Sequence, residues 1–337
     1  MIETYEPLHQ KYRPTRFDEL IGQDPISSTL KQALTSNRIA PAYIFSGPRG
    51  TGKTSSARIF AKSLNCLKSD KATIKPCGEC ELCKGINSGN ALDVIEIDAA
   101  SNTGVENIRE LIERSRFAPA KARWKVYVID ECHMLSTAAF NALLKTLEEP
   151  PRQVVFILAT TDPQRVLPTI LSRCMRFDFR RIGMQDLKSH LSNIARKEEI
   201  MINEGAISLI AKHSQGGLRD AESLLDQVSL LPAPINESNI INLIGAVPEE
   251  ELINLAKSLA NTDPNSILNI CNSLINKGKE PIAILQGVAS ILRDLVVSKV
   301  ANNETNLYSI SKENSKNLNE LANSINLEQI LSLQSKL

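Results

Sequence analysis

Four short apolar segments that alternate with helical stretches constrain the fold of this chain most strongly. They are AYIF (42–45), DVIEI (93–97), KVYVID (125–130) and VVFILA (154–159). Each is rich in Val, Ile, Tyr and Phe and mostly apolar on both faces, which is typical of the central strands of a helix-covered parallel sheet. The segments between them, such as VENIRELIERSR, place apolar residues three to four positions apart. This alternation predicts an α/β fold with a parallel sheet.

The second half of the chain has a different pattern. Beyond Arg180 the strand signals stop, and segments such as MQDLKSHLSNIARKEEI and LRDAESLLDQVSLL are helical by periodicity and separated by Gly or Pro. A second boundary is expected near LLPAPINESN (230–239), and the chain beyond it is again helical. Because 337 residues exceed the size at which one hydrophobic core keeps growing, we expect an α/β domain followed by helical domains.

The composition excludes several classes of protein. A net charge of +1 excludes a generally basic nucleic-acid coat, so any DNA contact would need a local patch or several chains acting together. Nothing approaches eighteen consecutive apolar residues, and the first fourteen residues are polar and charged, so we expect no membrane span, no secretory signal and a cytoplasmic location. Seven cysteines in such a chain favour metal ligands or free thiols over disulfides.

A glycine-rich motif follows the first apolar segment and precedes a helical stretch. SGPRGTGKT matches the pattern G-x-x-x-x-G-K-[ST], in which backbone N–H groups surround phosphates, the lysine reaches the β- and γ-phosphates, and the hydroxyl binds Mg²⁺. The lysine here is Lys53 and the hydroxyl belongs to Thr54. The residues predicted to bind ATP in this loop are Gly47, Pro48, Arg49, Gly50, Thr51, Gly52, Lys53 and Thr54.

Polar residues at the ends of two later strands complete a predicted site for Mg²⁺-dependent ATP hydrolysis. Asp130 ends an apolar strand and is predicted to hold Mg²⁺, and Glu131 is predicted to orient and deprotonate the attacking water. VVFILATTD ends in Thr160 and Thr161, whose hydroxyls could touch the γ-phosphate or the water. His133 is interpreted as a packed or surface histidine.

Two arginines could offset transition-state charge or could simply be surface charges. Arg173 follows a short predicted helix in LPTILSRCMRF, and Arg219 opens another in GGLRDA.

Four cysteines form a spaced cluster between the loop motif and the second strand. Cys66, Cys77, Cys80 and Cys83 read C-x10-C-x2-C-x2-C, and four thiolates complete a tetrahedral Zn²⁺ shell of the structural kind. An iron–sulfur run would need a fourth cysteine at position 87, which is Asn. Unliganded thiols remain the other alternative. The zinc module is predicted over 66–83, and the remaining cysteines, Cys132, Cys174 and Cys271, are interpreted as buried small residues.

The order of the motifs resembles a known family. KYRPTRFDELIGQ, SGPRGTGKT, the cysteine cluster, EIDAAS, VIDECHMLS, NALLKTLEEPP, ATTDP, LSRC and GGLRDA occur as in the gamma/tau family of bacterial DNA polymerase III, the clamp-loader ATPases. The resemblance implies an AAA+ nucleotide-binding domain over 1–180, a helical lid over 181–243 and a helical collar that oligomerises over 244–337. It is dense over residues 5–230 and rests on length and position beyond them.

The resemblance also implies roles for single residues. Thr161 is expected to act as a sensor at the strand end, Arg219 to reach the γ-phosphate of its own chain, and Arg173 to reach the ATP of a neighbouring chain. The residues expected near the adenine are Tyr12, Arg13, Pro14, Leu20 and Ile21.

The implied function is loading of the sliding clamp onto primed DNA within the DNA polymerase III holoenzyme. Implied partners are further copies of the chain, delta- and delta-prime-type subunits, the sliding clamp, primed DNA and the polymerase core. No two-metal nucleotidyl-transfer constellation is seen, so the chain itself is expected to lack polymerase chemistry.

The loop after EIDAAS carries Asn102 and Gly104 where some relatives carry basic residues, which leaves Arg109 and Lys145 as candidate DNA contacts. Two rival functions are a non-hydrolysing structural subunit and an AAA+ DNA translocase. Nucleotide turnover and strand displacement would discriminate them.

Overall fold

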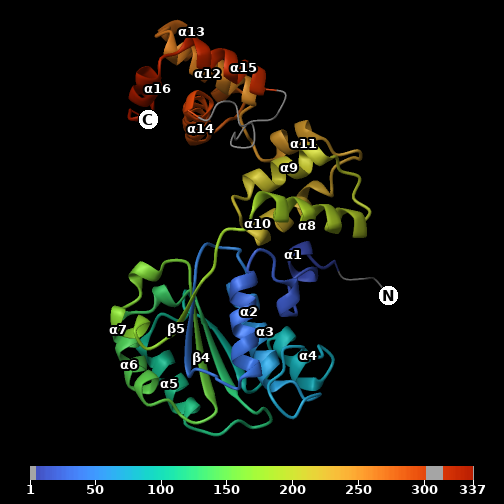
Figure 1. Ribbon diagram of the computed structural model, residues 1–337, viewed down its shortest axis with the longest axis vertical. Coiled ribbons are helices and arrows are strands. Elements are labelled where there is room, and N and C mark those ends of the chain that lie inside the picture. Colours follow the sequence, from blue (N-terminus) through green and yellow to red (C-terminus); the bar gives the residue numbers. More distant parts are fainter. Residues whose placement is uncertain (1–4, 301–313, 337) are drawn as a thin grey trace. The chain divides into compact units, whose positions relative to one another are not determined.

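The computed structural model describes residues 5–300 and 314–336 (Figure 1). It divides into two compact units, Met1–Ala233 and Pro234–Leu337. The three-domain division at 180 and 243 stays a prediction, because the lid helices belong to the first unit here.

A five-stranded parallel sheet forms the centre of the first unit. Its strand order is β2-β3-β4-β1-β5, and every neighbouring pair is parallel. The strands are β1 (Ala42–Ser46), β2 (Val94–Asp98), β3 (Lys125–Asp130), β4 (Val154–Thr160) and β5 (Met175–Asp178). The four strands predicted from the apolar segments are confirmed, and β5 is an additional edge strand.

Helices cover both faces of the sheet because alternate strand residues point to opposite sides. On one face, Tyr43 and Phe45 of β1 pack with Phe60 of α3 in a core that also includes residues of α2. On the other, Ile44 packs in a separate core with residues of α5 and α6. Figure 1 shows the two groups of helices on either side of the strands. The bounds are α2 (Asp24–Thr35), α3 (Lys53–Asn65), α4 (Glu81–Ser88), α5 (Val105–Ser115), α6 (Thr137–Glu148) and α7 (Pro168–Leu171).

Three lid helices and one short N-terminal helix complete the first unit. They are α8 (Met184–Lys197), α9 (Glu204–His213), α10 (Leu218–Val228) and α1 (Leu8–Lys11). Helix α1 packs against α10, where the backbone N–H of Leu8 and the hydroxyl of Tyr5 both donate to Asp226. Ile182 lies just before the first lid helix, α8, and Gly216 lies just before α10. The Ile182 N–H donates to the Gly216 carbonyl at 3.1 Å.

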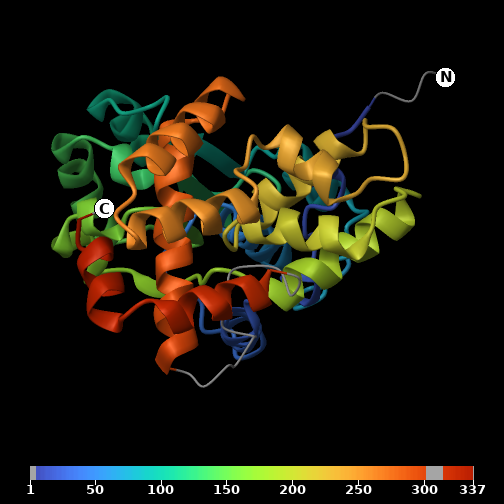
Figure 2. The same ribbon diagram turned by 90° about the horizontal axis from the view of Figure 1, so that it is seen from above.

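The second unit is all-helical and has its own core. Its helices are α11 (Glu237–Leu243), α12 (Glu249–Ala260), α13 (Pro264–Asn276), α14 (Pro281–Val300), α15 (Ser315–Ser324) and α16 (Leu327–Gln334). Helix α14, seen lengthwise in orange in Figure 2, contacts α12, α15 and α16. By length and composition alone it could cross a membrane. Its buried residues, among them Ile284, Val288 and Leu292, instead belong to the core of this unit.

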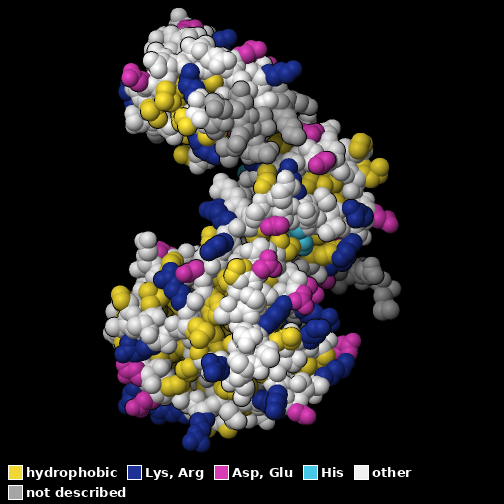
Figure 3. Space-filling model, viewed as in Figure 1, with side chains coloured by type: hydrophobic (Ala, Val, Ile, Leu, Met, Phe, Trp, Pro, Cys, Tyr) yellow, Lys and Arg dark blue, Asp and Glu magenta, His cyan; other side chains and the backbone are white. Residues whose placement is uncertain are grey.

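Charges of both signs are interspersed on the molecular surface. Figure 3 shows Lys and Arg side chains next to Asp and Glu side chains over the visible face, in keeping with the net charge of +1. The two candidate DNA contacts are both exposed, and Arg109 pairs with Glu106 one helical turn away at 2.8 Å.

A buried carboxylate fixes the segment that leads into β3. Asp93 is only 3% exposed and accepts hydrogen bonds of 2.8 Å from the backbone N–H groups of Ala120, Lys121 and Ala122. Burial alone would raise the pKa of Asp93, but these donors and the Lys125 ammonium hold that pKa below the ordinary aspartate value.

Asp93→Asn should therefore destabilise the first unit by about 1–3 kcal/mol at pH 7, because one buried N–H loses its acceptor. Since the folded-state pKa is depressed, the stabilisation is present above the unfolded-state pKa and is lost as the pH falls through the folded-state value. Urea unfolding of both proteins between pH 7 and pH 3 checks this, with the exposed Asp70→Asn as control. An equal difference at every pH would contradict the role of the Asp93 charge.

Candidate active site

The glycine-rich loop lies between the carboxyl end of β1 and the start of α3. Gly47 has φ +145°, and a Cβ there would lie 2.4 Å from the Phe179 carbonyl oxygen, so only glycine fits. The ammonium of Lys53 donates to the carbonyls of Gly47 at 2.9 Å and Pro48 at 2.8 Å. Burial lowers the pKa of Lys53, and the nearby carboxylates of Glu131 and Asp130 oppose that shift. The glycine-rich loop therefore holds the buried Lys53 ammonium beside the first backbone N–H groups of α3.

Two oxygen ligands suited to Mg²⁺ lie next to each other beside this cation. The Thr54 hydroxyl donates to Asp130 Oδ2 at 2.7 Å, and Asp130 Oδ1 accepts from the backbone N–H of Glu131 at 2.9 Å. In octahedral coordination, ligand oxygens about 2.0–2.1 Å from Mg²⁺ lie roughly 2.9 Å apart. The spacing and the hydroxyl–carboxylate donor set thus fit a magnesium ion held by Thr54 and Asp130.

Glu131 is contacted by two side chains, that of Thr161 after β4 and that of His133 after β3. Its Oε2 accepts from the Thr161 hydroxyl at 2.9 Å and from the Thr161 N–H at 3.3 Å. His133 Nδ1 lies 3.4 Å from the same oxygen and 3.0 Å from the Thr160 hydroxyl. Glu131 has a left-handed backbone conformation, with φ 46°, which non-glycine residues seldom adopt. His133 is therefore in direct contact with the predicted base, which its place in the sequence did not indicate.

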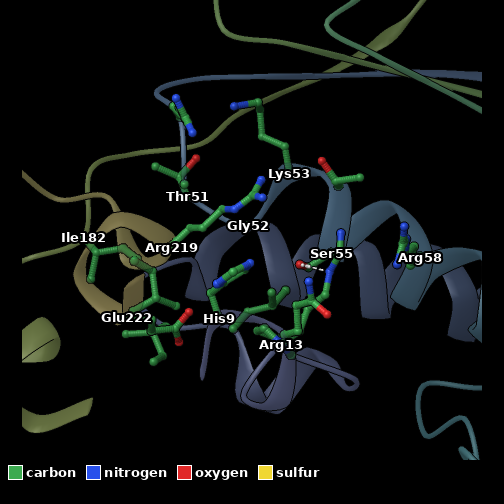
Figure 4. Close-up of a pocket in the computed structure, with 18 of the residues that line it drawn as sticks. His9, Arg13, Thr51, Gly52, Lys53, Ser55, Arg58, Ile182, Arg219 and Glu222 are labelled. Atoms are coloured by element: carbon green, nitrogen blue, oxygen red, sulfur yellow. Dashed lines mark hydrogen bonds between the residues drawn. The ribbon is translucent and has the colours of Figure 1, made fainter. Parts of the chain in front are cut away.

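The lid closes one side of the same pocket. The Leu218 N–H donates to the Gly50 carbonyl at 2.9 Å, so the start of α10 is joined to the glycine-rich loop. This brings Arg219 into the pocket (Figure 4). The Arg13 guanidinium lies nearby and donates to the Ser55 hydroxyl at 3.1 Å. Burial and the neighbouring Arg58 and Arg219 lower the pKa of Arg13.

The structure brings most of the predicted site residues around one cavity of about 520 Å³. The predicted residues that line it are Arg13, Pro14, Leu20, Ile21, Arg49, Gly50, Thr51, Gly52, Lys53, Thr54, Asp130, Glu131 and Arg219. Lining residues that the sequence did not single out are Glu6, His9, Gln10, Ser55, Arg58, Asn87, Ile182, Leu218 and Glu222.

Among the described residues, six that were predicted for the ATP site do not line the cavity: Tyr12, Gly47, Pro48, Thr160, Thr161 and Arg173. The carbonyls of Gly47 and Pro48 accept from the Lys53 ammonium, and the Thr161 hydroxyl donates to Glu131. The Tyr12 hydroxyl donates to Glu198 of the lid at 2.5 Å, so its place next to the adenine stays a prediction. Arg173 is half-buried and donates to the Thr169 carbonyl and to Glu148 Oε1.

The four clustered cysteines converge on one point. Their sulfur atoms all lie within 4.8 Å of one another, and the Cys77 and Cys83 sulfurs are 3.9 Å apart. Zn–S bonds of about 2.3 Å in a tetrahedron put sulfurs roughly 3.8 Å apart, so the donor set fits structural zinc. Backbone N–H groups of Cys80 and Glu79 donate to the Cys77 sulfur and lower its pKa to about 6.

The remaining cysteines only partly match the interpretation as buried residues. Cys132 is buried, and Cys174 and Cys271 are half-buried.

Family models cover almost the whole chain in order. "DNA polymerase III, delta subunit" matches residues 22–183, "DNA polymerase III clamp loader subunit, ATPase lid domain" matches 186–229, and "DNA polymerase III subunits gamma and tau domain III" matches 235–334. The chain is 46% identical to DNA polymerase III subunit tau of Bacillus subtilis over 300 residues. The chain belongs to the DNA polymerase III gamma/tau family.

This confirms the resemblance seen in the motifs. The chain is also 40% identical to DNA polymerase III subunit tau of Escherichia coli over 299 residues, which are 88% of this chain. It spans 53% of the Bacillus protein and 46% of the Escherichia protein, about half the length of these gamma/tau relatives.

A solved structure confirms the predicted fold class. The Thermotoga maritima RuvB Holliday junction branch migration motor superposes with a TM-score of 0.52 at 19% identity, over 80% of this chain and 86% of that one. At this identity the likeness concerns the fold alone. The parallel sheet, the lid and the all-helical second unit together give this gamma/tau chain an AAA+ architecture.

Proposed function

We propose that this chain is a Mg²⁺-dependent ATPase subunit of a bacterial clamp loader, which uses ATP to load the sliding clamp onto primed DNA. One observation carries the proposal. In a chain of the gamma/tau family, Lys53, Thr54, Asp130, Glu131 and Arg219 all line a single cavity. A non-hydrolysing structural subunit would not need this set.

The chemistry follows from the contacts. Glu131 takes a proton from a water molecule whose oxygen bonds to the γ-phosphorus while the bond to the β–γ bridging oxygen breaks, which releases ADP and phosphate. Thr161 holds Glu131, and Lys53 with Arg219 offsets the charge on the leaving phosphate oxygens. Thr54 and Asp130 would hold Mg²⁺, which neutralises charge on the β- and γ-phosphates when bound.

The partners we propose follow from the family. They are further copies of this chain, delta- and delta-prime-type subunits, the clamp, primed DNA and the polymerase core, in a cytoplasmic holoenzyme whose nucleotidyl transfer is performed by another subunit. The test is ATP turnover by the assembly reconstituted with these partners. We expect stimulation by clamp and primed DNA together. If neither clamp nor primed DNA changes the rate of ATP turnover, and the assembly displaces a DNA strand, the result would favour a translocase and contradict clamp loading.

Lys53→Ala should abolish ATP binding and turnover, because it removes the cation that faces the β- and γ-phosphates. The loop glycines and the apolar core are unchanged, so we expect the circular dichroism spectrum of the parent. Equilibrium binding of a fluorescent ATP analogue measures the effect. Lys68→Ala, at an exposed lysine paired with Glu79, is the control and should bind like the parent. If Lys53→Ala hydrolyses ATP normally, the glycine-rich loop is not the phosphate-binding site.

Glu131→Gln should bind ATP with nearly the parent affinity and hydrolyse it at least about 100-fold more slowly, because the amide cannot accept the proton. Single-turnover hydrolysis with Mg²⁺ present measures the chemical step. Glu113→Gln on the exposed face of α5 should leave the rate unchanged. If Glu131→Gln hydrolyses ATP at the parent rate, Glu131 is not the group that activates water.

We further propose one structural zinc ion per chain at the four cysteines. Elemental analysis should find about one zinc per purified chain and none in Cys80→Ser, whereas Cys271→Ser, a cysteine of the second unit, should retain it. Because the site holds a peripheral insertion, Cys80→Ser should speed proteolysis within 66–83 and change turnover little. Zinc-free parent protein, or an iron–sulfur absorption band, would contradict this site.

Arg173 is proposed to act on the ATP of the neighbouring chain. It lies outside the cavity of its own chain, so Arg173→Ala should keep its own ATP affinity and lose turnover. A mixture of Arg173→Ala and Lys53→Ala chains should recover part of the activity, because some interfaces pair an intact Lys53 with an intact Arg173. Arg176→Ala, at an exposed arginine on β5, is the control. Co-assembled mixtures with no recovered turnover would make Arg173 a same-chain or structural residue.

A further inference from the structure

A buried carboxylate of the lid lines the nucleotide cavity and has no part in the chemistry above. Glu222 is 3% exposed and lies on α10, one turn beyond Leu218 and Arg219, which line the same cavity. Its Oε1 forms a hydrogen bond of 2.8 Å with His190 Nε2 on α8. For Glu222 Oε2, no protein hydrogen bond is found within the part of the chain that the structure describes. One acceptor oxygen of a buried glutamate is therefore left for a group in the cavity.

The cavity is lined by residues of two chemical kinds. Lys53, Asp130 and Glu131 are suited to phosphates and metal. Five apolar residues suit the flat faces of a nucleotide base; these are Pro14, Leu20, Ile21, Ile182 and Leu218. Glu222 follows Leu218 by one helical turn on α10, and His9 of α1, which packs against α10, lines the cavity with it. Figure 4 shows His9 and Glu222 on the same side of Arg219.

We propose that Glu222 is the residue that selects adenine, its free Oε2 accepting a hydrogen bond from the 6-amino group of the base. This proposal rests on the proposed ATPase function and adds the residue that distinguishes adenine from other bases. Because Oε1 is already bonded to His190, Glu222 offers one acceptor, which matches the single amino group of adenine. Guanine presents a carbonyl oxygen at the 6-position, and a carboxylate oxygen facing it would be left repelled and unpaired.

His190 has the role of a positioning residue. Burial raises the pKa of Glu222, and the hydrogen bond with His190 opposes that shift. The same hydrogen bond holds the Glu222 carboxyl group with Oε1 toward α8. A pair that only joined α8 to α10 would change lid stability and would not distinguish one base from another. Base discrimination is therefore the readout that separates the two roles.

The test measures the affinities of ATP, purine riboside triphosphate and inosine triphosphate by calorimetry with Mg²⁺. Purine riboside lacks the 6-amino group, and inosine has a 6-carbonyl. The parent should bind ATP roughly 10-fold more tightly than purine riboside triphosphate, the value of one hydrogen bond to a charged acceptor. Glu222→Leu should abolish this preference by weakening ATP alone. Asp226→Asn, one turn further along α10 and outside the cavity, should keep the preference.

A second variant keeps the shape of the site. Glu222→Gln retains one acceptor and adds an N–H donor, so it should bind inosine triphosphate several-fold more tightly than the parent does. Glu222→Gln is the deciding variant if Glu222→Leu fails to fold. If Glu222→Gln binds inosine triphosphate with the parent affinity, the proposal is overturned.

Equal weakening of all three nucleotides by Glu222→Leu, or an unchanged preference, would also overturn the proposal and leave the ATPase function standing. A parent that binds none of the three would overturn both.

Discussion

The active site depends on one geometric constraint, the parallel alignment of the strands. In a parallel sheet all carboxyl ends lie at one edge, and in this order β4 lies between β1 and β3. The register pairs Ser46 with Thr160 and Asp98 with Asp130. The loop after β1, the carboxylates after β3 and the threonines at the end of β4 are therefore brought within hydrogen-bond reach of one another. An antiparallel neighbour would send one of these loops to the opposite edge.

A second constraint joins the lid to this edge. Gly50 of the loop approaches the lid so closely that a Cβ there would lie 3.3 Å from Gly217 Cα, and Leu218 donates to the Gly50 carbonyl. A nucleotide in the cavity would touch the loop through its phosphates and the lid through Arg219. Any change in the position of the lid would then change nucleotide affinity, and by linkage nucleotide binding would favour one lid position over another. The proposed clamp-loading function requires this coupling between nucleotide and lid.

The sequence predicted the parts of the site whose positions follow from local patterns. Lys53, Asp130 and Glu131 each stand at the end of a strongly apolar strand or the start of a helix, so their spatial neighbourhood follows from the parallel fold. The edge strand β5 was missed because three of its four residues are exposed, which leaves no apolar segment to detect.

The contribution of the lid to the cavity could not be predicted in the same way. Glu222 is one of four charged residues in the amphipathic helix α10, and such residues usually lie on the solvated face. His133 and His9 are equally ordinary in the sequence. His9 lines the cavity because α1 packs against α10. His133 contacts Glu131, two residues before it, and reaches Thr160 because β3 lies beside β4. Tyr12 is the opposite case, a residue that was predicted to line the site and does not. Its hydroxyl instead donates to Glu198 of the lid.

The central claim is that one ATP is bound jointly by the glycine-rich loop and by the start of the lid helix α10. Hydrogen exchange followed by mass spectrometry, with and without Mg²⁺-ATP, tests it most directly. The account predicts that exchange slows both in 47–54 and in 218–222 when ATP is bound. Bound ATP that protects neither segment, or the loop without the lid, would contradict it.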